Sequence, residues 1–177
     1  MVDGPLIIGV TMGDPAGIGP EIGAKLLSAR CQDQEIYPVM IGSAEALGVA
    51  LKLIGIDAHL NVLSEFDPHN LQPGAINVYD PGALNITDVV VGQLDELAGE
   101  ASMLYNRQGA ELAMTGQIHG LVTLPVTKAS TKLAGYDYPG QAEYFAKLAG
   151  NLPFTTILIY KEFRAALFTT PVSYTHL

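Results

Sequence analysis

The amino-acid sequence predicts an α/β fold, with a mostly parallel sheet that helices cover on both faces. Short apolar runs rich in β-branched residues alternate along the chain with longer runs of helical spacing. That alternation is typical of parallel strands joined by crossover helices. The 177 residues are 49% hydrophobic, with a mean hydropathy of +0.27. The chain is therefore long enough and apolar enough to bury a core.

The first predicted strand and helix flank a loop rich in glycine and proline. Residues 6–10 form a short apolar run that predicts a buried strand, and Ile22, Leu26 and Leu27 then recur at helical spacing. Pro20 suits the first turn of that helix, where its missing N–H costs nothing.

The loop itself, Thr11 to Gly19, is predicted to be preorganised. Gly13, Gly17 and Gly19 allow positive φ or the close approach of another group, and Pro15 limits how far the loop can move. Asp14 could act as an acid or base, although an aspartate before proline more often forms a turn. We expect several backbone N–H groups here to face a ligand. The alternative is a tight connection that binds nothing.

The rest of the chain continues the alternation. Further strands are predicted at 36–43, 58–63, 75–79, 120–124, 155–160 and 164–170, and further helices at 44–56, 90–115 and 140–150. Two more polar loops, 123–130 and 138–143, are expected to follow strands. Ligands bind at the carboxyl ends of parallel strands, so the three loops are predicted to share a cleft. Lys128 offers a cation there, or is a solvated lysine that opens a helix.

Composition and spacing argue against several classes of function. Acidic residues outnumber basic ones 18 to 9 without basic runs, which disfavours nucleic acid and membrane surfaces as partners but leaves a small anionic substrate open. Cys31 is the only cysteine, so no disulfide or cysteine metal site is expected. The histidines, His59, His69, His119 and His176, lack metal-ligand spacing. No leader or membrane-length apolar run is visible, and a cytoplasmic location is predicted.

Three segments, "GDPAGIGPE", "LVTLPVTK" and "YPGQAEYFA", occur in an order and spacing that resemble the 4-hydroxythreonine-4-phosphate dehydrogenase family of vitamin B6 biosynthesis. The resemblance runs from Ile7 to about Thr170. It implies oxidation and decarboxylation of a phosphorylated 3-hydroxy acid, 4-phosphooxy-threonine in pyridoxal phosphate biosynthesis. It also implies NAD (or NADP), a divalent metal such as zinc, magnesium or cobalt, and a homodimer. The family's two-lobed fold is similar to that of the isocitrate and isopropylmalate dehydrogenases.

The resemblance also implies a division of the chain. Residues 1–127 correspond to a first α/β lobe and residues 128–170 to the start of a second. Residues 171–177 do not resemble the family and are interpreted as an artefactual tail. We therefore expect the chain to be an inactive amino-terminal fragment of a longer enzyme.

Family members usually carry Gly-His-Thr-Glu where this sequence has Gly140, Gln141, Ala142 and Glu143. Gln141, Ala142 and Glu143, with Lys128, are the expected substrate-binding residues, and Asp14, Gly17 and Gly19 line the cleft. Because Gln cannot become a cation and Ala lacks a hydroxyl, a sugar-acid phosphate or an aromatic dihydrodiol is an alternative substrate.

Pro171 stands where the family has a metal-binding histidine, so no metal ligand is expected in this chain, and the pattern assigns no catalytic acid or base. A non-catalytic binding module of the same fold is the alternative function.

Overall fold

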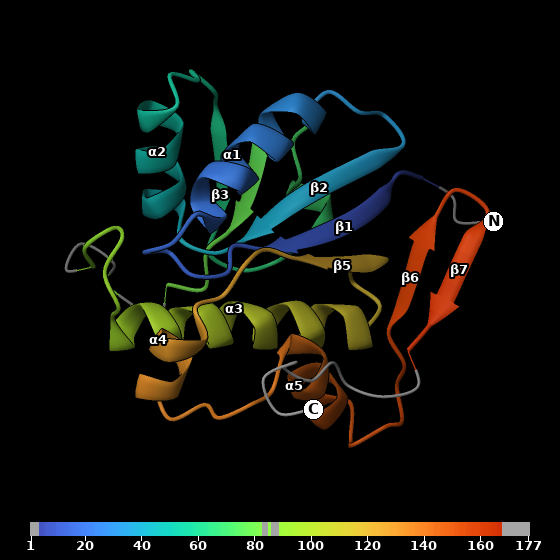
Figure 1. Cartoon of the computed structure of the whole chain (residues 1–177). Helices are drawn as coiled ribbons and strands as arrows, with labels where there is room; N and C mark the ends of the chain where they lie inside the picture. The colour runs from blue at the N-terminus through green and yellow to red at the C-terminus, as the bar shows by residue number, and fades with distance from the viewer. Residues whose placement is uncertain (1–3, 83–84, 86–88, 168–177) are drawn as a thin grey trace. The chain divides into compact units, whose positions relative to one another are not determined.

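The computed structural model describes residues 4–82, 85 and 89–167. They belong to two compact units, Met1–Pro139 and Gly140–Leu177. Within the described residues, the first unit contains a parallel sheet of order β3-β4-β2-β1-β5 (Figure 1). Its strands are β1 (Leu6–Thr11), β2 (Ile36–Ile41), β3 (Leu60–Leu63), β4 (Ile76–Tyr79) and β5 (Gly120–Thr123).

Helices cover both faces of this sheet. Figure 1 shows α1 (Gly19–Arg30) and α2 (Ala44–Leu53) on one face and the long helix α3 (Glu96–Met114) on the other. The short helix α4 (Lys128–Leu133) packs against α3, and a 3₁₀ turn spans Pro68–Asn70. The predicted α/β class, with a parallel sheet between helical layers, is confirmed.

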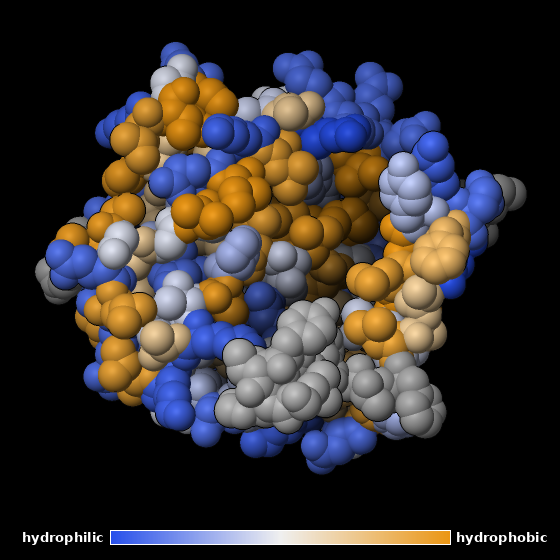
Figure 2. Space-filling model, in the orientation of Figure 1, coloured by the Kyte–Doolittle hydropathy of each residue, from blue (hydrophilic) through white to orange (hydrophobic). Residues whose placement is uncertain are grey.

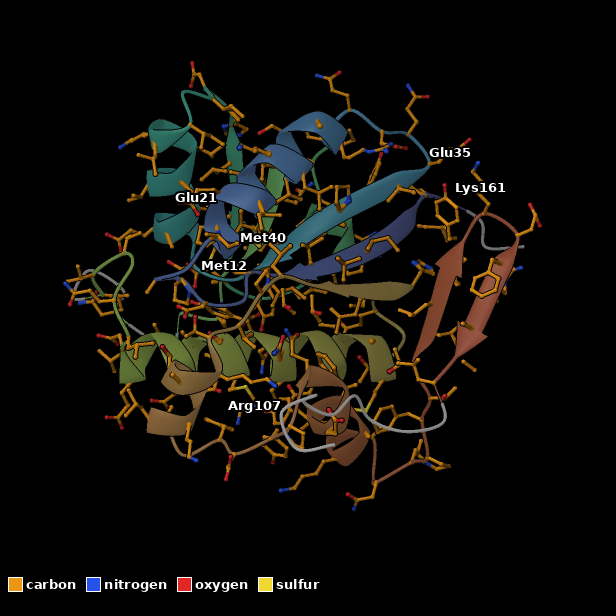
Figure 3. The ribbon with its side chains drawn as sticks, viewed as in Figure 1. Met12, Glu21, Glu35, Met40, Arg107 and Lys161 are labelled. Atoms are coloured by element: carbon orange, nitrogen blue, oxygen red, sulfur yellow. The ribbon has the colours of Figure 1, made fainter. Side chains whose placement is uncertain are left out.

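The central strands β1 and β2 provide most of the core. Val10, Val39, Met40 and Ile41 are almost fully buried, because helices cover these strands on both sides. Met12 and Met40, labelled in Figure 3, are both fully buried near the carboxyl ends of β1 and β2. The end of Met40 lies against Gly23 of α1, and the side chain of Met12 lies against Gly42 just beyond β2.

Helix α3 begins later than the predicted residue 90. The Asp95 side chain accepts a hydrogen bond from the Ala98 backbone N–H at 3.0 Å and caps the helix at Glu96. Gly92 before it has φ of 84°, which a right-handed helix cannot contain. The interior glycines do not interrupt α3. Gly99 lies against the backbone of Ser130 in α4, so it permits two helices to approach closely.

The second unit contains helix α5 (Gln141–Leu148) and an antiparallel pair of strands, β6 (Ile157–Tyr160) and β7 (Phe163–Ala166). The prediction of two neighbouring strands is confirmed. Helix α4 belongs to the first compact unit, and the boundary expected between two lobes at 127/128 stays a prediction. None of the helices in the described ranges is both long and apolar enough to cross a membrane.

Two helical glycines should respond in opposite directions to substitution by alanine. In Gly99→Ala the new methyl group would meet the Ser130 carbonyl, so we expect a loss of about 1–3 kcal/mol in the free energy of unfolding. In Gly48→Ala, inside α2, the methyl group meets nothing within 4 Å, and we expect a gain of about 0.5–1 kcal/mol from helix propensity. Denaturant unfolding of both variants tests this, and equal effects would refute the close α3–α4 contact.

Candidate functional site

The strand order of the sheet places a switch point between β1 and β5. The chain leaves β1 for helix α1 on one face, whereas it leaves β5 for helix α4, which packs against α3 of the other face. In open α/β sheets, ligands bind outside the carboxyl ends of the strands at such a point. The loops that follow β1 and β5 are therefore the candidate site, and two of the three predicted loops do follow neighbouring strands.

Backbone contacts join these two loops directly. The Asp14 N–H donates to the Pro125 carbonyl at 2.9 Å, and the Leu124 N–H donates to the Thr11 carbonyl at 3.1 Å. Gly13 has φ of +70°, and a Cβ at this position would meet the Pro125 carbonyl oxygen. The pairing of the loops therefore depends on a residue without a side chain, in a left-handed conformation.

The other loop glycines differ from each other. A Cβ at Gly19 would meet the Met12 carbonyl oxygen, so the expected close approach is confirmed there. Gly17 does not have a positive φ, and the atom nearest to a Cβ would be the Asp14 Cβ at 3.3 Å. Gly17 is thus closely packed with an ordinary backbone, so of the two roles expected of the loop glycines, positive φ does not apply to it.

Asp14 is a turn-forming residue. Its side chain is only 2% exposed, and Oδ1 accepts a hydrogen bond from the Ala16 N–H at 2.8 Å. Its backbone carbonyl accepts from the Gly17 N–H at 3.0 Å. These bonds wind the chain from Asp14 to Gly17 into a turn. Of the two alternatives that the sequence left open, the structure supports the turn former.

A buried polar pair beneath the loop was not predicted from the sequence. The Thr11 hydroxyl, at the end of β1, donates to Oδ1 of Asn106 in α3 at 2.9 Å, and both side chains are completely buried. The pair links helix α3 to the start of the glycine loop. The only sequence signal for Asn106 is its place on the same helical face as Ser102 and Gly109, and that signal does not identify Thr11 as the partner.

Two tyrosines near this edge of the sheet keep their protons. Burial raises the pKa of Tyr79, the carboxylates of Glu111 and Glu65 raise it further, and its hydroxyl donates to Gln108 Oε1 at 2.9 Å. Burial likewise raises the pKa of Tyr105, with a contribution from Asp80. Both side chains are therefore neutral hydrogen-bonding groups at physiological pH.

The predicted substrate-binding residues begin two different helices. Lys128 is exposed and is the first residue of α4, at the end of the loop after β5. Gln141, Ala142 and Glu143 begin α5 in the second compact unit. Their loop, 138–143, follows helix α4 and not a strand, so the prediction of a third strand-end loop is wrong. The grouping of these residues with Lys128 stays a prediction.

Metal-type side chains do not gather in the part of the chain that the structure describes, where no three of His, Cys, Asp and Glu lie close enough to hold an ion. His119 has a structural contact instead, because its Nδ1 accepts from the Ile7 N–H at 2.9 Å at the start of β1. Pro171 and His176 lie outside the described residues.

The sequence matches the family described as "Pyridoxal phosphate biosynthetic protein PdxA" over residues 34–177. The chain belongs to this family. It is 33% identical over 170 residues to a 4-hydroxythreonine-4-phosphate dehydrogenase of Trichlorobacter lovleyi, covering 96% of this chain and 51% of that protein. It is 28% identical over 173 residues to a Clostridium botulinum protein named for D-threonate 4-phosphate dehydrogenase, covering 98% and 52%.

A solved structure of the same family has the same fold. The 4-hydroxythreonine-4-phosphate dehydrogenase of Burkholderia phymatum is 30% identical, with a TM-score of 0.85, over 97% of this chain and 52% of that chain. The chain thus spans about half the length of the PdxA relatives it matches. The resemblance drawn from the three sequence segments is confirmed.

The glycine loop of this PdxA family member should tolerate alanine at one position and not at another. Gly13→Ala forces a methyl group toward the Pro125 carbonyl at positive φ, and we expect a loss of about 1–3 kcal/mol in the free energy of unfolding. Gly17→Ala has an ordinary backbone, and its nearest neighbour, the Asp14 Cβ at 3.3 Å, is far less crowded than the Pro125 carbonyl is at Gly13, so we expect a loss below about 1 kcal/mol. Thermal unfolding of the two variants measures the difference, and an equal loss would contradict the assignment of strain to Gly13.

Proposed function

We propose that this chain forms part of a dehydrogenase that oxidises a phosphorylated 3-hydroxy acid and releases carbon dioxide. The first choice of substrate is 4-hydroxythreonine 4-phosphate, in pyridoxal phosphate biosynthesis. The observation that carries the proposal is the match to the PdxA family over residues 34–177. The paired loops at the switch point of the sheet support it, since that is where an α/β enzyme binds its ligands.

The residues of this chain would bind and orient the substrate. Lys128 is an exposed cation at the end of the loop after β5, suited to a phosphate or carboxylate. Gln141 can donate and accept hydrogen bonds, and Glu143 can accept them. NAD or NADP, when bound, would take the hydride from the hydroxyl-bearing carbon. The described residues contain no cluster that fits a divalent metal, so metal ligation is assigned to none of them.

A second substrate is favoured by two observations. Curated relatives named for D-threonate 4-phosphate dehydrogenase match almost the whole chain. Gln141 and Ala142 replace the histidine and threonine that the resemblance leads us to expect. D-threonate 4-phosphate is also a sugar-acid phosphate, the class of alternative substrate that those two residues suggested. We further propose a homodimer and a cytoplasmic location for the complete enzyme.

Turnover assays with both phosphorylated acids test the proposal. The longer protein and the 177-residue chain would be assayed in parallel with NAD, NADP and divalent metals, by the absorbance of the reduced nicotinamide. We expect turnover of at least one substrate by the longer protein and none by the chain alone. A longer protein that binds these ligands without turnover would instead be the non-catalytic module.

Lys128 should contribute to substrate binding. In the Lys128→Ala variant of the longer protein we expect KM for the phosphorylated acid to rise about tenfold or more, because a charge-assisted hydrogen bond is lost. Lys132→Ala is a matched control, since Lys132 is also exposed and lies on the same short helix. Its KM should stay within about twofold of the unsubstituted enzyme. Equal KM values for the two variants would remove Lys128 from the site.

A further inference from the structure

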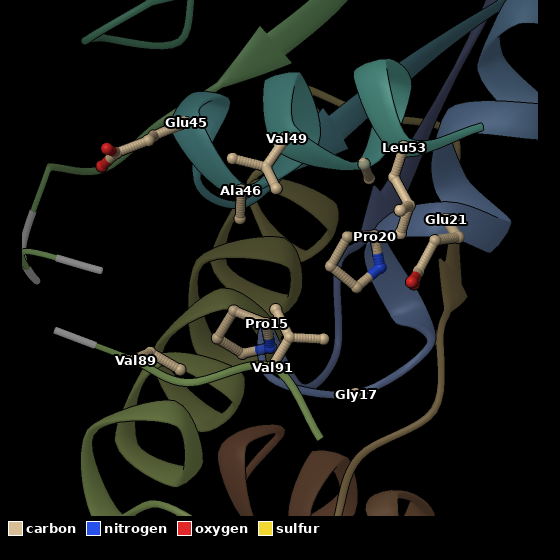
Figure 4. Close-up of a pocket in the computed structure, with 11 residues that line it drawn as sticks. Pro15, Gly17, Pro20, Glu21, Glu45, Ala46, Val49, Leu53, Val89 and Val91 are labelled. Carbon is tan, nitrogen blue, oxygen red and sulfur yellow. The ribbon is translucent and has the colours of Figure 1, made fainter. Parts of the chain in front are cut away.

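The first compact unit leaves apolar side chains uncovered on its helices and on its sheet. Apolar residues are exposed on the face that carries α1 and α2 (Figure 2). There, Val49 and Leu53 of α2 line a pocket of about 240 Å³ beside the glycine loop (Figure 4). Such helical side chains leave no backbone group unpaired. At the edge strand β5, by contrast, backbone groups are uncovered together with an apolar side chain.

Strand β5 is the last strand of the sheet beyond the switch point, and its outer edge has no partner strand among the described residues (Figure 1). Strands β6 and β7 form a separate sheet of their own. The His119 N–H donates to the Ile7 carbonyl of β1, so the N–H groups of the alternate residues Gly120 and Val122 face away from β1. The Val122 side chain is also 44% exposed.

The sequence of this edge is typical of a strand inside a sheet. Residues Gly120–Thr123 include no lysine, glutamate or proline, which are the residues that commonly protect an exposed edge. Ile118 and Leu124, on either side of the strand, are buried, and parallel strands in such apolar runs are normally buried as well. An edge without protection indicates that a further strand pairs with it.

The PdxA relatives contain enough additional chain to provide that strand. This chain matches the Burkholderia phymatum enzyme over 97% of its own length but over only 52% of that chain. A segment that continues the α/β alternation would provide both a strand along β5 and a helix over Val122. A second copy of this chain, related by two-fold symmetry, would instead pair β5 with β5 in antiparallel orientation, next to an otherwise parallel sheet.

We propose that a strand from the remaining half of the longer PdxA protein pairs with the outer edge of β5 and extends the sheet. This strand accepts the N–H groups of Gly120 and Val122, and the helix that accompanies it covers Val122. The inference rests on the family and on the open edge, and it does not depend on the proposed oxidation. Because β5 lies at the switch point, the added strand lies beside the candidate site, and this chain alone holds only part of that site.

Hydrogen exchange distinguishes the two edges of β5. In the 177-residue chain, the Gly120 and Val122 amides should exchange at least about 100-fold faster than the Leu121 amide, which faces β1. In the longer protein, the three amides should exchange within about tenfold of each other. Fast exchange of Gly120 and Val122 in the longer protein would overturn the proposal, whether or not the shorter chain folds. The readout is independent of turnover, so a failure of the proposed oxidation does not affect it.

A pair of variants at one position tests the outward N–H group. Val122→Pro removes this donor, whereas Val122→Ala shortens the same side chain and keeps the donor. Proline is tolerated at an open edge but not between two strands. In the longer protein, the melting temperature of Val122→Pro should be at least about 5 °C below that of Val122→Ala. In the 177-residue chain the two should agree within about 2 °C. Equal melting temperatures in the longer protein would contradict the added strand.

The concentration of the 177-residue chain separates the other possible partners of β5. Exchange of the Gly120 and Val122 amides should stay fast at every concentration. Slower exchange at high concentration, with a dimer in sedimentation, would assign the edge to a second copy. Slow exchange in a monomeric chain would show that the chain covers its own edge. Either result would overturn the proposal.

Discussion

The contact between Gly13 and the Pro125 carbonyl is the constraint on which the candidate site depends. It brings the loop after β1 against the loop after β5, where the Asp14 N–H and the Leu124 N–H complete the pairing beyond the ends of the strands. The two strands are paired as far as Thr11 and Thr123 and then leave for opposite helical layers, so this contact keeps their loops together beyond the strand ends. A side chain at Gly13 cannot be accommodated while the bond to Pro125 remains.

The rest of the loop follows from that constraint. Once Asp14 is fixed by its backbone, its carboxylate accepts the Ala16 N–H and turns the chain toward α1. Gly19 then passes close to the Met12 carbonyl. Pro15 and Pro20 then lie beside α2, where they line a pocket together with Glu21. One rigid loop therefore contributes both to the strand-end site and to the pocket.

The sequence predicted where the helices and strands lie better than it predicted which of their residues are buried. The strands around Val10 and Val39 are short and strongly apolar, and such runs identify buried parallel strands without tertiary information. For α1 the spacing of Ile22 and Leu26 predicted a helix correctly, but both residues are more than a third exposed. Gly23, Ala24 and Leu27 form the buried face, because Gly23 receives the end of Met40 from β2. A glycine gives no hydrophobic signal.

Parts of the site needed the structure for a similar reason. The loop glycines look alike in sequence, yet only tertiary contacts distinguish Gly13 from Gly17. The pair of Thr11 and Asn106 joins residues far apart in the chain, and no local pattern specifies such a contact. The three family segments predicted the family itself, because they preserve order and spacing and need no coordinates.

Native-state hydrogen exchange tests the pairing of the two loops most directly. The Met12 N–H, which donates to the Ile41 carbonyl at 3.0 Å, provides an internal reference for the end of β1. If the loops are fixed to each other, the Asp14 and Leu124 amides should exchange within about tenfold of the Met12 rate. Exchange of both amides at the rate of an unstructured peptide, with Met12 still protected, would contradict the account.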